Sequence, residues 1–405
     1  MIVIKNISVE VRKKVNDMFK RIFLVVLDSC GVGEAEDADK FGDTGSNTLL
    51  HTIENRNYNL DVLEKLGLTA LVGKEFDKIR AIYCKAKPIN NAKDTLNGHY
   101  EMMGAVQKTP YKTYPDGFPL ELISKIQQVC GREVIGNVVA SGTEIIKELG
   151  EMQMKTGSII VYTSADSVLQ IAAHTDVVPL EELYDICSKV RELTKGDDYK
   201  IARIIARPFI GKPGSFTRTS DRHDYALNPP RNVLDLLDRA SIQTIAIGKI
   251  SDIFNNKSIA VKIKTKDNID GMVKLIDFAK GNFKGLLFAN LNDFDTLYGH
   301  RRDKDGYLKA LEEFNYYLPI FIKNLKEDDL LIITADHGND PTFKGTDHTR
   351  ENVPVILYNP LFKKGKRISD RETFADIGAT ILDNFNIVND LGIGKSIFDD
   401  LKKEE

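Results

Sequence analysis

Tryptophan is absent from this chain of 405 residues, and cysteine is scarce, with four residues in all. These residues, Cys30, Cys84, Cys130 and Cys187, are widely spaced and include no Cys-x-x-Cys pair. Such a distribution excludes the dense disulfide framework of a small secreted domain and is typical of reduced thiols. We therefore expect a cytoplasmic protein.

The chain also lacks a large excess of charge of one sign, and it lacks long apolar runs. The 56 basic and 59 acidic side chains give a formal net charge of −3, so we expect neither nucleic acid nor a membrane as a partner. The run IFLVVL, residues 22–27, is too short for a signal peptide, ends in an aspartate and lacks a small-residue cleavage site. No run approaches the roughly 20 apolar residues that span a bilayer. A local basic pocket for small anions remains compatible with this composition.

Short apolar runs rich in β-branched residues are present, and they alternate with helical patterns. Near-continuous apolar runs of about five to seven residues are typical of strands buried on both faces, as in a parallel sheet covered by helices. We therefore predict an α/β fold with a central, mostly parallel sheet flanked by helices. The predicted strands lie at residues 22–28, 158–166, 244–249, 285–295, 329–338 and 353–358.

Two helices are predicted in detail. Over residues 179–195, a proline in the first turn, one apolar face and a following glycine indicate a helix. In SGTEIIKELG, residues 141–150, Ser141 and Glu144 have the spacing of a capping box. Gly150 is expected to end that second helix.

The aspartates that follow apolar runs are confined to the two outer parts of the chain. Asp28, Asp295 and Asp336 lie there, whereas the middle part has strand and helix patterns of its own. Turn-rich segments at 110–119 and 228–230 flank this middle part. We predict a core formed by residues 1–109 and 227–405, with an inserted α/β cap domain at residues 110–226.

Aspartates and histidines cluster near the predicted strand ends, since three of the seven histidines fall between residues 300 and 348, each within five residues of an aspartate. In open α/β sheets, ligands bind beyond the carboxyl ends of the strands, so we expect these side chains to converge. Carboxylate and imidazole ligands suit Zn²⁺, Mn²⁺ or Fe²⁺, and six of them suit two ions about 4 Å apart, which supports phosphoryl transfer. Each residue alone is more simply a helix cap or a buried histidine, but the set favours metal. The candidate ligands are Asp28, Asp295, His300, Asp336, His337 and His348.

A nucleophile is needed between two such ions, and the segment AKDTLNGHYEMMG, residues 92–104, offers Thr95. A hydroxyl is a weak nucleophile at its ordinary pKa, and coordination to cations activates it. In the alternative, Asp94 or Thr95 is the N-cap of a helix. For this segment taken alone, the helix cap is the simpler interpretation.

Several blocks, in order along the chain, resemble one known family. They are RIFLVVLDSCGVGEAEDADKFGDTGSNT, KDTLNGHYEMMG, YTSADSVLQIAAH, RIIARPFIG, LNDFDTLYGHRRD and ITADHGNDPTFKGTDHTRENVP. Together they are similar to the phosphopentomutases of the prokaryotic type, in the alkaline phosphatase superfamily. The resemblance extends from about residue 20 to about residue 395 and includes the middle insertion.

The resemblance implies an alkaline-phosphatase-like core with an inserted cap domain and two Mn²⁺ ions. By motif position the ligands divide into two sets, one with Asp28, Asp336 and His337 and the other with Asp295, His300 and His348. Asp347 belongs to neither set, and we expect it to orient a ligand rather than to bind metal.

Thr95 matches the first residue of the family's Thr-x-x-Gly-His element. By this resemblance, Thr95 would bridge the two ions and carry the phosphoryl group. The family has a second threonine and a tryptophan in this element where the chain has Asn97 and Tyr100. These differences leave the proposed chemistry in place and concern the pocket around it.

The implied cap would hold the far end of a sugar phosphate, and arginine forks are well suited to a phosphate dianion. Arg203, Arg218 and Lys249 match family positions suited to that role. Asp166 matches a position directed toward the ribose hydroxyls. Without the resemblance, these residues are ordinary surface charges with salt bridges.

The implied activity is the interconversion of α-D-ribose 1-phosphate and D-ribose 5-phosphate, and of the 2-deoxyribose pair, in nucleoside salvage. It would proceed through phospho-Thr95 and a sugar 1,5-bisphosphate, with a sugar bisphosphate as activator. The alternatives are a metal-dependent phosphatase or a phosphoglycerate-type mutase on the same core, or a metal-binding protein without catalysis. The expected partners are pentose phosphates, and the sequence predicts no oligomeric state. Residues 1–17 fall outside the resemblance, so either Met18 is the start or this segment is a short amphipathic helix.

Overall fold

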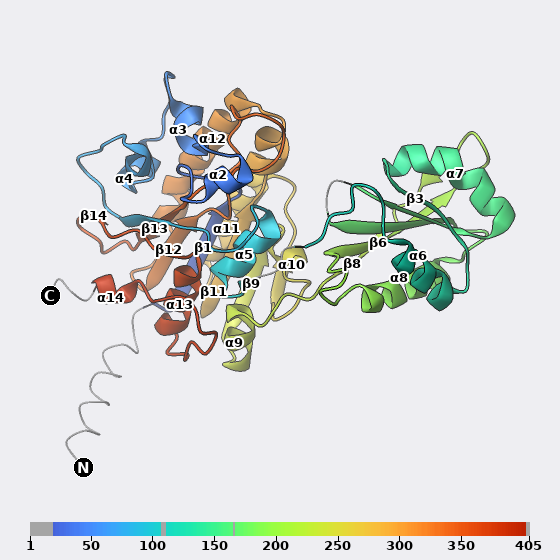
Figure 1. Cartoon of the computed structure of the whole chain (residues 1–405). Coiled ribbons are helices and arrows are strands. Elements are labelled where there is room, and N and C mark those ends of the chain that lie inside the picture. The colour runs from blue at the N-terminus through green and yellow to red at the C-terminus, as the bar shows by residue number, and fades with distance from the viewer. Residues whose placement is uncertain (1–18, 107–110, 165–166, 402–405) are drawn as a thin grey trace, which may run out of the picture. The chain divides into compact units, whose positions relative to one another are not determined.

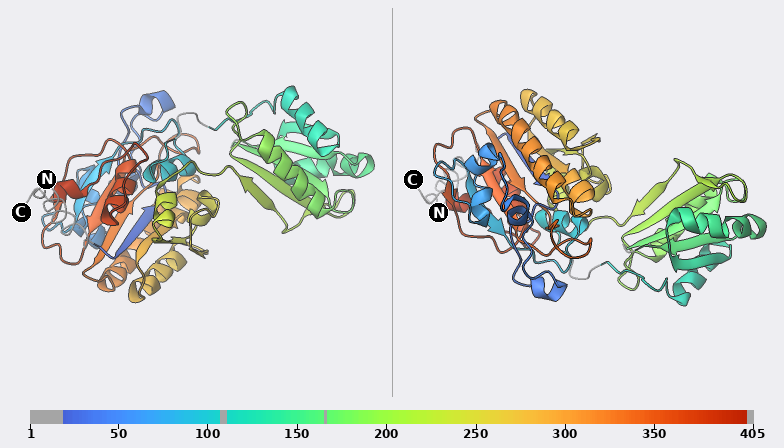
Figure 2. Two further views of the ribbon diagram at one scale, coloured as in Figure 1. Left: turned by 90° about the horizontal axis from the view of Figure 1, so that it is seen from below. Right: turned by 90° about the horizontal axis from the view of Figure 1, so that it is seen from above.

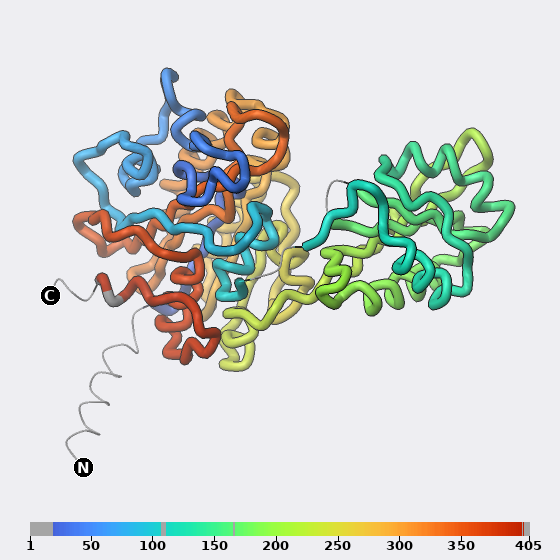
Figure 3. Tube along the Cα trace, viewed as in Figure 1, coloured from blue at the N-terminus to red at the C-terminus, as the bar shows by residue number. Residues whose placement is uncertain are grey.

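The chain forms two compact units, which are Met1–Lys108 with Pro229–Glu405 and Thr109–Asn228. The computed structural model describes residues 19–106, 111–164 and 167–401. Figure 3 follows the chain from the first unit into the second and back, so the second unit is a single insertion. The second unit covers Thr109–Asn228, and the cap domain was predicted at residues 110–226. The predicted start or helix at residues 1–17 lies outside the described residues.

The core unit is built around a sheet of eight described strands (Figure 1). They are β1 (Arg21–Leu27), β2 (Ile82–Ala86), β9 (Gln243–Ile247), β10 (Val261–Ile263), β11 (Gly285–Leu291), β12 (Asp329–Thr334), β13 (Val353–Tyr358) and β14 (Lys366–Arg367). Their order is β10-β9-β11-β1-β12-β13-β2-β14. Strand β13 is antiparallel to its neighbours β12 and β2, and the other pairs of described strands in this sheet are parallel. The predicted mostly parallel sheet is confirmed.

The register of the central strands brings their carboxyl ends to one edge of the sheet. Arg21 in β1 lies opposite Gly285 of β11 and Asp329 of β12, and Leu27 lies opposite Leu291. Every residue of these three strands is buried. At the opposite edge, Arg21 and Asp329 form a buried ion pair at 2.5 Å. The loops that follow β1, β11 and β12 therefore leave the sheet side by side.

Helices cover both faces of the core sheet. They are α2 (Ala38–Phe41), α3 (Thr48–Ile53), α4 (Asp61–Lys65), η1 (Thr69–Val72), α5 (Thr95–Met102), α9 (Val233–Arg239), α10 (Ile250–Ile253), α11 (Asn268–Lys280), η2 (Phe294–Gly299), α12 (Lys304–Lys323), α13 (Ala375–Asn384) and α14 (Phe398–Leu401). Right-handed crossovers place α11 and α12 on one face and α10, which packs with α5, on the other, giving three layers (Figure 2). Packing agrees, because α12 contacts α11, α3 and α4, whereas α13 contacts α5 and α9. No helix in the described part of the chain has both the length and the apolar character that crossing a membrane requires.

The inserted unit has its own sheet with helices on both faces (Figure 1). Its described elements are β3 (Val134–Val139), β4 (Ile159–Thr163), β5 (Val168–His174), β6 (Arg203–Ile210), β7 (Thr217–Arg218), β8 (His223–Ala226), α6 (Leu120–Cys130), α7 (Gly142–Thr156) and α8 (Leu180–Leu193). The order is β3-β4-β5-β6-β7, and β8 also pairs with β6. Along β4, Ile159 and Val161 pack with α6 and α8, whereas Ile160 and Tyr162 pack with α7. The helix predicted over residues 179–195 is confirmed as α8.

Helix α7 differs from its prediction at both ends. The side chain of Ser141 makes no capping hydrogen bond, so the predicted capping box with Glu144 is wrong. The helix continues past Gly150 and ends before Gly157, which has a φ of 72°. Gly150 serves packing instead, because a Cβ there would lie 2.6 Å from the ring of Phe216.

The four cysteines are all free in the structure, and Cys30, Cys84 and Cys187 are buried. Burial raises the pKa of Cys30 and of Cys84 to about 12. A thiol with so high a pKa has little thiolate at neutral pH and is a poor nucleophile. These buried cysteines therefore belong to the core packing.

Candidate active site

Three side chains from the loops after β1 and β12 meet at the carboxyl edge of the core sheet. Asp28 directly follows β1, and Asp336 and His337 follow β12 after one intervening residue. All three are buried. The Nε2 atom of His337 lies 3.5 Å from Asp28 Oδ1 and 3.3 Å from Asp336 Oδ2. The three side chains are thus close enough to share one cation.

Three further side chains adjoin this group. Strand β11 ends at Leu291, so Asp295 is not at the strand end as predicted but in the π-helical turn η2. The Nε2 atoms of His300 and His348 lie 3.2 and 3.4 Å from the two oxygens of the Asp295 carboxylate. The ring centroids of His348 and His337 are 4.0 Å apart, so the second group of side chains adjoins the first.

This donor set fits divalent cations. The oxygens Asp28 Oδ1 and Asp336 Oδ2 are buried and have no hydrogen-bond partner among the described residues. A buried carboxylate oxygen without a donor is costly unless a cation meets it. The potential ligand atoms form two overlapping groups, and within each group they lie within 4.8 Å of one another. One group is Asp28, Asp336 and His337, and the other is Asp295, His337 and His348. Oxygen and imidazole nitrogen together suit Mn²⁺, Zn²⁺ or Fe²⁺.

Backbone carbonyls determine which nitrogen of two histidines faces the cluster. The Nδ1 atom of His300 lies 2.7 Å from the carbonyl oxygen of Thr346, and that of His337 lies 3.0 Å from the carbonyl oxygen of Gly338. A carbonyl oxygen only accepts, so Nδ1 is the donor and the neutral ring keeps its lone pair on Nε2. Such an outer hydrogen bond is the usual way to orient a metal-binding histidine.

Burial and mutual repulsion control the charge of the cluster. Burial, reinforced by the carboxylates of Asp336 and Asp295, raises the pKa of Asp28 well above its usual range. Burial also acts to raise the pKa of Asp336, but the charges of His337 and His99 outweigh it and the pKa is lowered to about 2. For His337, burial acts to lower the pKa, and the surrounding carboxylates raise it to about 9. Without a cation, the cluster therefore holds a proton at neutral pH.

The affinity for divalent metal is expected to rise with pH. A cation must displace the proton of His337, whose pKa is raised to about 9, so the protonated form predominates below that pH. Apparent affinity for Mn²⁺ should rise about tenfold per pH unit for each proton displaced, and level off above about pH 9. Calorimetry in buffers of different ionisation enthalpy counts the released protons. Equal affinity at about pH 6 and about pH 8 would contradict this account.

Thr95 is the first residue of α5, and its hydroxyl faces the cluster. Asp94 caps the helix, because its carboxylate accepts a backbone hydrogen bond from the first turn at 3.0 Å. The Oγ1 atom of Thr95 instead lies 3.2 Å from His337 Nε2. Gly98 permits this close approach, since a Cβ there would lie 2.0 Å from the carbonyl oxygen of Asp336. Helix cap and candidate nucleophile are therefore different residues.

The two departures from the resembled family have structural roles within α5. Asn97 donates through Nδ2 to the carboxylate of Asp94 at 2.7 Å, which strengthens the cap. The hydroxyl of Tyr100 donates to the carbonyl oxygen of Ile253 at 2.9 Å, which ties α5 to α10. Both side chains thus hold the helix that carries Thr95.

Arg302 connects the loops that carry the second group of ligands. Its guanidinium donates to three backbone carbonyl oxygens, one in η2 and two in the loop of residues 345–347, at 2.8, 2.6 and 2.7 Å. It also donates to Asn339 Oδ1, and Asn339 Nδ2 donates to Asp295 Oδ1 at 2.7 Å. Arg302 has a φ of 55°, which is uncommon for a residue with a side chain. This one side chain fixes both Asp295 and the loop before His348.

Replacing Arg302 with glutamine is expected to weaken one metal site more than the other. The loop of residues 345–347 and Asn339 lose their shared donor, and loss of such an outer contact typically costs about 10- to 100-fold in metal affinity. A Mn²⁺ titration should resolve one weakened and one unchanged site. Arg301→Gln, at the exposed neighbouring position, is the matched control. Equal weakening of both sites would show that Arg302 acts only on overall stability.

The other predicted binding residues are divided between the two units. Lys249 directly precedes α10 in the core unit, and its charge acts to lower the pKa of Asp28. Arg203 begins β6 and Arg218 ends β7, both in the inserted unit. Asp166 lies outside the described residues. Only Lys249 of these four is therefore described within the unit that holds the ligand cluster.

Asp347 lies outside both groups of ligand atoms. Its Oδ1 accepts from the backbone N–H of His348 at 2.8 Å, and its Oδ2 lies 3.2 Å from Lys93 Nζ. Its side chain is 75% exposed, unlike the buried carboxylates of the cluster. These contacts orient the backbone that carries His348.

The sequence interpretation missed the residues that hold the ligands in place. Arg302 and Asn339 each lie two residues after a predicted ligand, in the segments GHRRD and DHGND, so proximity along the chain was their available signal. His99 lies four residues after Thr95, on the same face of a helix. The Nδ1 atom of His99 is 2.8 Å from the carbonyl oxygen of Thr95 and 3.2 Å from Asp336 Oδ2.

One family of known proteins matches most of this chain. The model of the Metalloenzyme superfamily matches residues 20–389, a range that contains all six predicted metal ligands and Thr95. Similar solved structures include the PH0037 protein from Pyrococcus horikoshii, with 13% identity over 93% of this chain and 100% of that chain and a TM-score of 0.48. Phosphoglycerate mutase of Leishmania mexicana at low cobalt concentration has 12% identity over 93% and 97% and a TM-score of 0.46. An alkaline phosphatase from the Antarctic bacterium TAB5 has 12% identity over 92% and 99% and a TM-score of 0.36.

Proposed function

The chain belongs to the Metalloenzyme superfamily, and from this premise we propose that it is a phosphopentomutase acting on ribose and 2-deoxyribose phosphates. The observation that carries the proposal is the Thr95 hydroxyl, 3.2 Å from His337 Nε2 and beside two groups of side chains that could hold a metal ion. A hydroxyl next to a bound cation is an activated nucleophile for phosphoryl transfer. The choice of pentose phosphates rests on the sequence resemblance.

The residues of the cluster are proposed to hold two Mn²⁺ ions, which when bound would supply positive charge for the nucleophile and the phosphoryl oxygens. His300 and His337 contribute Nε2 because their Nδ1 atoms are engaged by carbonyl oxygens. Thr95 stands at the N-terminus of α5, where the helix dipole favours a negatively charged group. Lys249 adds a positive charge near Asp28 at the same edge of the sheet.

Phosphoryl transfer is proposed to occur in two balanced steps. The P–O bond of phospho-Thr95 breaks as a P–O bond to the free hydroxyl oxygen of the sugar monophosphate forms. The proton of that hydroxyl passes, in net terms, to Thr95 Oγ1, and a sugar 1,5-bisphosphate results. In the second step, Oγ1 takes the other phosphoryl group, and the sugar oxygen released regains the proton. An enzyme without phosphate on Thr95 needs a sugar bisphosphate for its first cycle.

The inserted unit is proposed to bind the part of the substrate that is not reacting. Arg203 and Arg218, together with Lys249 of the core unit, are the candidates for the phosphate at the far end, and Asp166 for the ribose hydroxyls. The support is chemical, since guanidinium and ammonium groups pair with phosphate and a carboxylate accepts from hydroxyl groups. Arg203 and Arg218 stand on neighbouring strands of one sheet.

A coupled assay that follows ribose 5-phosphate formed from ribose 1-phosphate tests the proposal. We expect turnover that needs Mn²⁺ and is stimulated by a catalytic amount of sugar bisphosphate. Parallel assays use 3-phosphoglycerate and an aryl phosphate as substrates. Turnover of either in place of the pentose phosphate would identify another mutase or a phosphatase on the same core. Mn²⁺ binding without turnover of any substrate would refute catalysis.

A further inference from the structure

A buried carboxylate that is not a candidate ligand lies between the loops that carry the ligands. Glu351 stands in the segment before β13, and its side chain is buried. A Cβ on Gly31 would lie 2.3 Å from Glu351 Oε2, and a Cβ on Gly338 would lie 2.5 Å from Glu351 Cδ. Gly31 is in the loop that begins with Asp28, and Gly338 directly follows His337. The carboxylate therefore occupies space that glycine leaves free in two ligand loops.

Four hydrogen bonds from described residues hold this carboxylate. The backbone N–H groups of Gly33 and Thr48 donate to Oε2 at 3.2 and 2.9 Å. The hydroxyl groups of Thr48 and Thr349 each donate to Oε1 at 2.7 Å. Burial raises the pKa of Glu351, and the hydrogen bonds from Thr349 and Thr48 act to lower it. All four groups are donors, so they favour the ionised carboxylate.

The two threonine hydroxyls extend the network to the segment after β12. Thr48 Oγ1 accepts from the backbone N–H of Asn339, and Thr349 Oγ1 accepts from that of Asp340, both at 3.0 Å. Asn339 in turn donates through its side chain to Asp295 Oδ1 at 2.7 Å. Each hydroxyl thus accepts on one side and donates on the other, so both chains of hydrogen bonds run toward the carboxylate.

The network contacts loops of both groups of candidate ligands. Through Gly33 it holds the loop that begins with Asp28. Through Thr349 it holds the residue directly after His348. The backbone of Thr349 also exchanges two hydrogen bonds with that of Gly338, at 3.2 and 2.9 Å. The side chain of Glu351 is therefore shared by segments from three parts of the chain.

We propose that Glu351 is a positioning residue that sets the placement of the two groups of metal ligands relative to each other. Outer hydrogen bonds of this kind orient the groups that bind a metal. Arg302, in contrast, contacts loops of the second group, so its loss should weaken one site. The inference deepens the proposed function and rests on its two metal ions, but not on the choice of substrate.

A titration of the full-length protein with Mn²⁺ tests this role. In Glu351→Gln, an NH₂ group replaces one oxygen and cannot accept, so two of the four donors lose their acceptor. Both sites should then bind Mn²⁺ about 10- to 100-fold more weakly than in the wild type. Weakening of one site alone, or of neither, would overturn the inference.

Glu351→Asp separates position from charge. Aspartate keeps the negative charge, but its carboxylate is one methylene group closer to its own backbone and does not reach all the donors at once. If placement is what matters, both sites should again weaken about tenfold or more. Wild-type affinity in Glu351→Asp together with weak binding in Glu351→Gln would show that only the charge acts, and would overturn the inference.

Glu101→Gln is the matched control for lost stability. Glu101 is also buried, in the last turn of α5, and accepts from the backbone N–H groups of Asn90 and Phe374 and from the hydroxyl of Thr373, at 2.9, 3.1 and 2.9 Å. The same substitution should lower the melting temperature there as well, but leave both Mn²⁺ affinities unchanged. Equal weakening of Mn²⁺ binding in Glu101→Gln and Glu351→Gln would reduce the effect to stability and overturn the inference.

Electron paramagnetic resonance adds a readout that stability does not move. Two Mn²⁺ ions about 4 Å apart are magnetically coupled, and the coupling depends on their separation. At saturating Mn²⁺, the signal of the coupled pair should shift in Glu351→Gln and in Glu351→Asp, and should match the wild type in Glu101→Gln. A wild-type signal in both Glu351 variants would overturn the inference.

These measurements use Mn²⁺ alone, so their outcome is independent of the reaction. Weakened binding at both sites, with no turnover of pentose phosphates by the wild type, would refute the proposed substrate and leave this inference in place. Turnover of pentose phosphates by the wild type, with unchanged Mn²⁺ binding in the Glu351 variants, would refute this inference alone.

Discussion

The Thr95→Ala protein is expected to transfer phosphoryl groups about 10⁴-fold more slowly than the wild type, or slower still, while binding the same number of metal ions. The substitution removes Oγ1, the atom that would bond to phosphorus. His337, whose Nε2 lies 3.2 Å from Oγ1, does not replace it, because the same nitrogen is a proposed metal ligand. The helix should persist, since Asp94 rather than Thr95 provides its cap. The measurement is the coupled assay with ribose 1-phosphate, Mn²⁺ and a sugar bisphosphate.

Thr95→Ser is the matched control for this experiment. Serine keeps a hydroxyl at the same position, so readily measurable turnover should remain. Peptide mass spectrometry of the active wild-type enzyme, after treatment with a sugar bisphosphate, should find phosphate on the peptide that contains Thr95. Full turnover by Thr95→Ala, or phosphate only on another peptide, would show that Thr95 is not the nucleophile.

The convergence of Asp28 and Asp336 could be predicted because it needs only strand pattern and strand direction. Each residue follows a continuous apolar run, and such runs are buried in a parallel sheet. Parallel neighbours end at the same edge, as the pairing of Val26 with Thr334 shows. The sequence interpretation therefore identified the sheet class, the edge and the convergence of these two aspartates. None of these conclusions depends on the conformation of a loop.

Loop conformation explains what was not predicted. Asp295 reaches the cluster from a π-helical turn beyond the end of β11, and an apolar run does not specify such a turn. Arg302 adopts a positive φ and binds carbonyl oxygens more than forty residues away, in the loop of residues 345–347. These contacts depend on the folded path of two loops, which sequence spacing does not encode.

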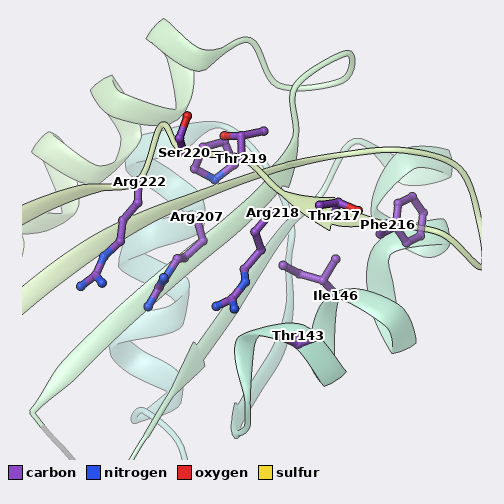
Figure 4. A pocket seen from close by; sticks show the side chains of 10 residues that line it. Thr143, Ile146, Arg207, Phe216, Thr217, Arg218, Thr219, Ser220 and Arg222 are labelled. Carbon is purple, nitrogen blue, oxygen red and sulfur yellow. The ribbon is translucent and has the colours of Figure 1, made fainter.

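The grouping of arginines in the inserted unit was predicted only in part, for a related reason. A cavity there is lined by Arg207, Arg218 and Arg222, of which the sequence interpretation had named Arg218 (Figure 4). Arg207 lies on β6, Arg218 on β7 and Arg222 on the segment after β7. Charge at these positions was visible in the sequence, but the grouping required the fold.

Loss of a single metal ion is the expected result of either Asp336→Asn or His348→Ala. Asp336 belongs to the group with Asp28, and His348 to the group with Asp295, so the two variants should lose different ions. The affected site should bind Mn²⁺ at least about 100-fold more weakly, because removal of a ligand should exceed the effect of losing an outer contact. Metal content after dialysis, measured by mass spectrometry, should fall from about two ions to about one in each variant.

Asp347→Asn is the matched control, because this aspartate adjoins His348 in sequence but lies outside both ligand groups. Asparagine can still accept from the backbone N–H of His348, so both ions should remain.

Asp336→Asn should also be folded, since Ser29 N–H, which donates to Asp336 Oδ1 at 3.0 Å, retains an acceptor. In that variant the pKa of His337 should fall, because the Asp336 carboxylate is among the charges that raise it. Metal binding at the remaining site should then depend less steeply on pH than in the wild type. Two retained ions in Asp336→Asn, or the loss of an ion in Asp347→Asn, would contradict the assignment of ligands.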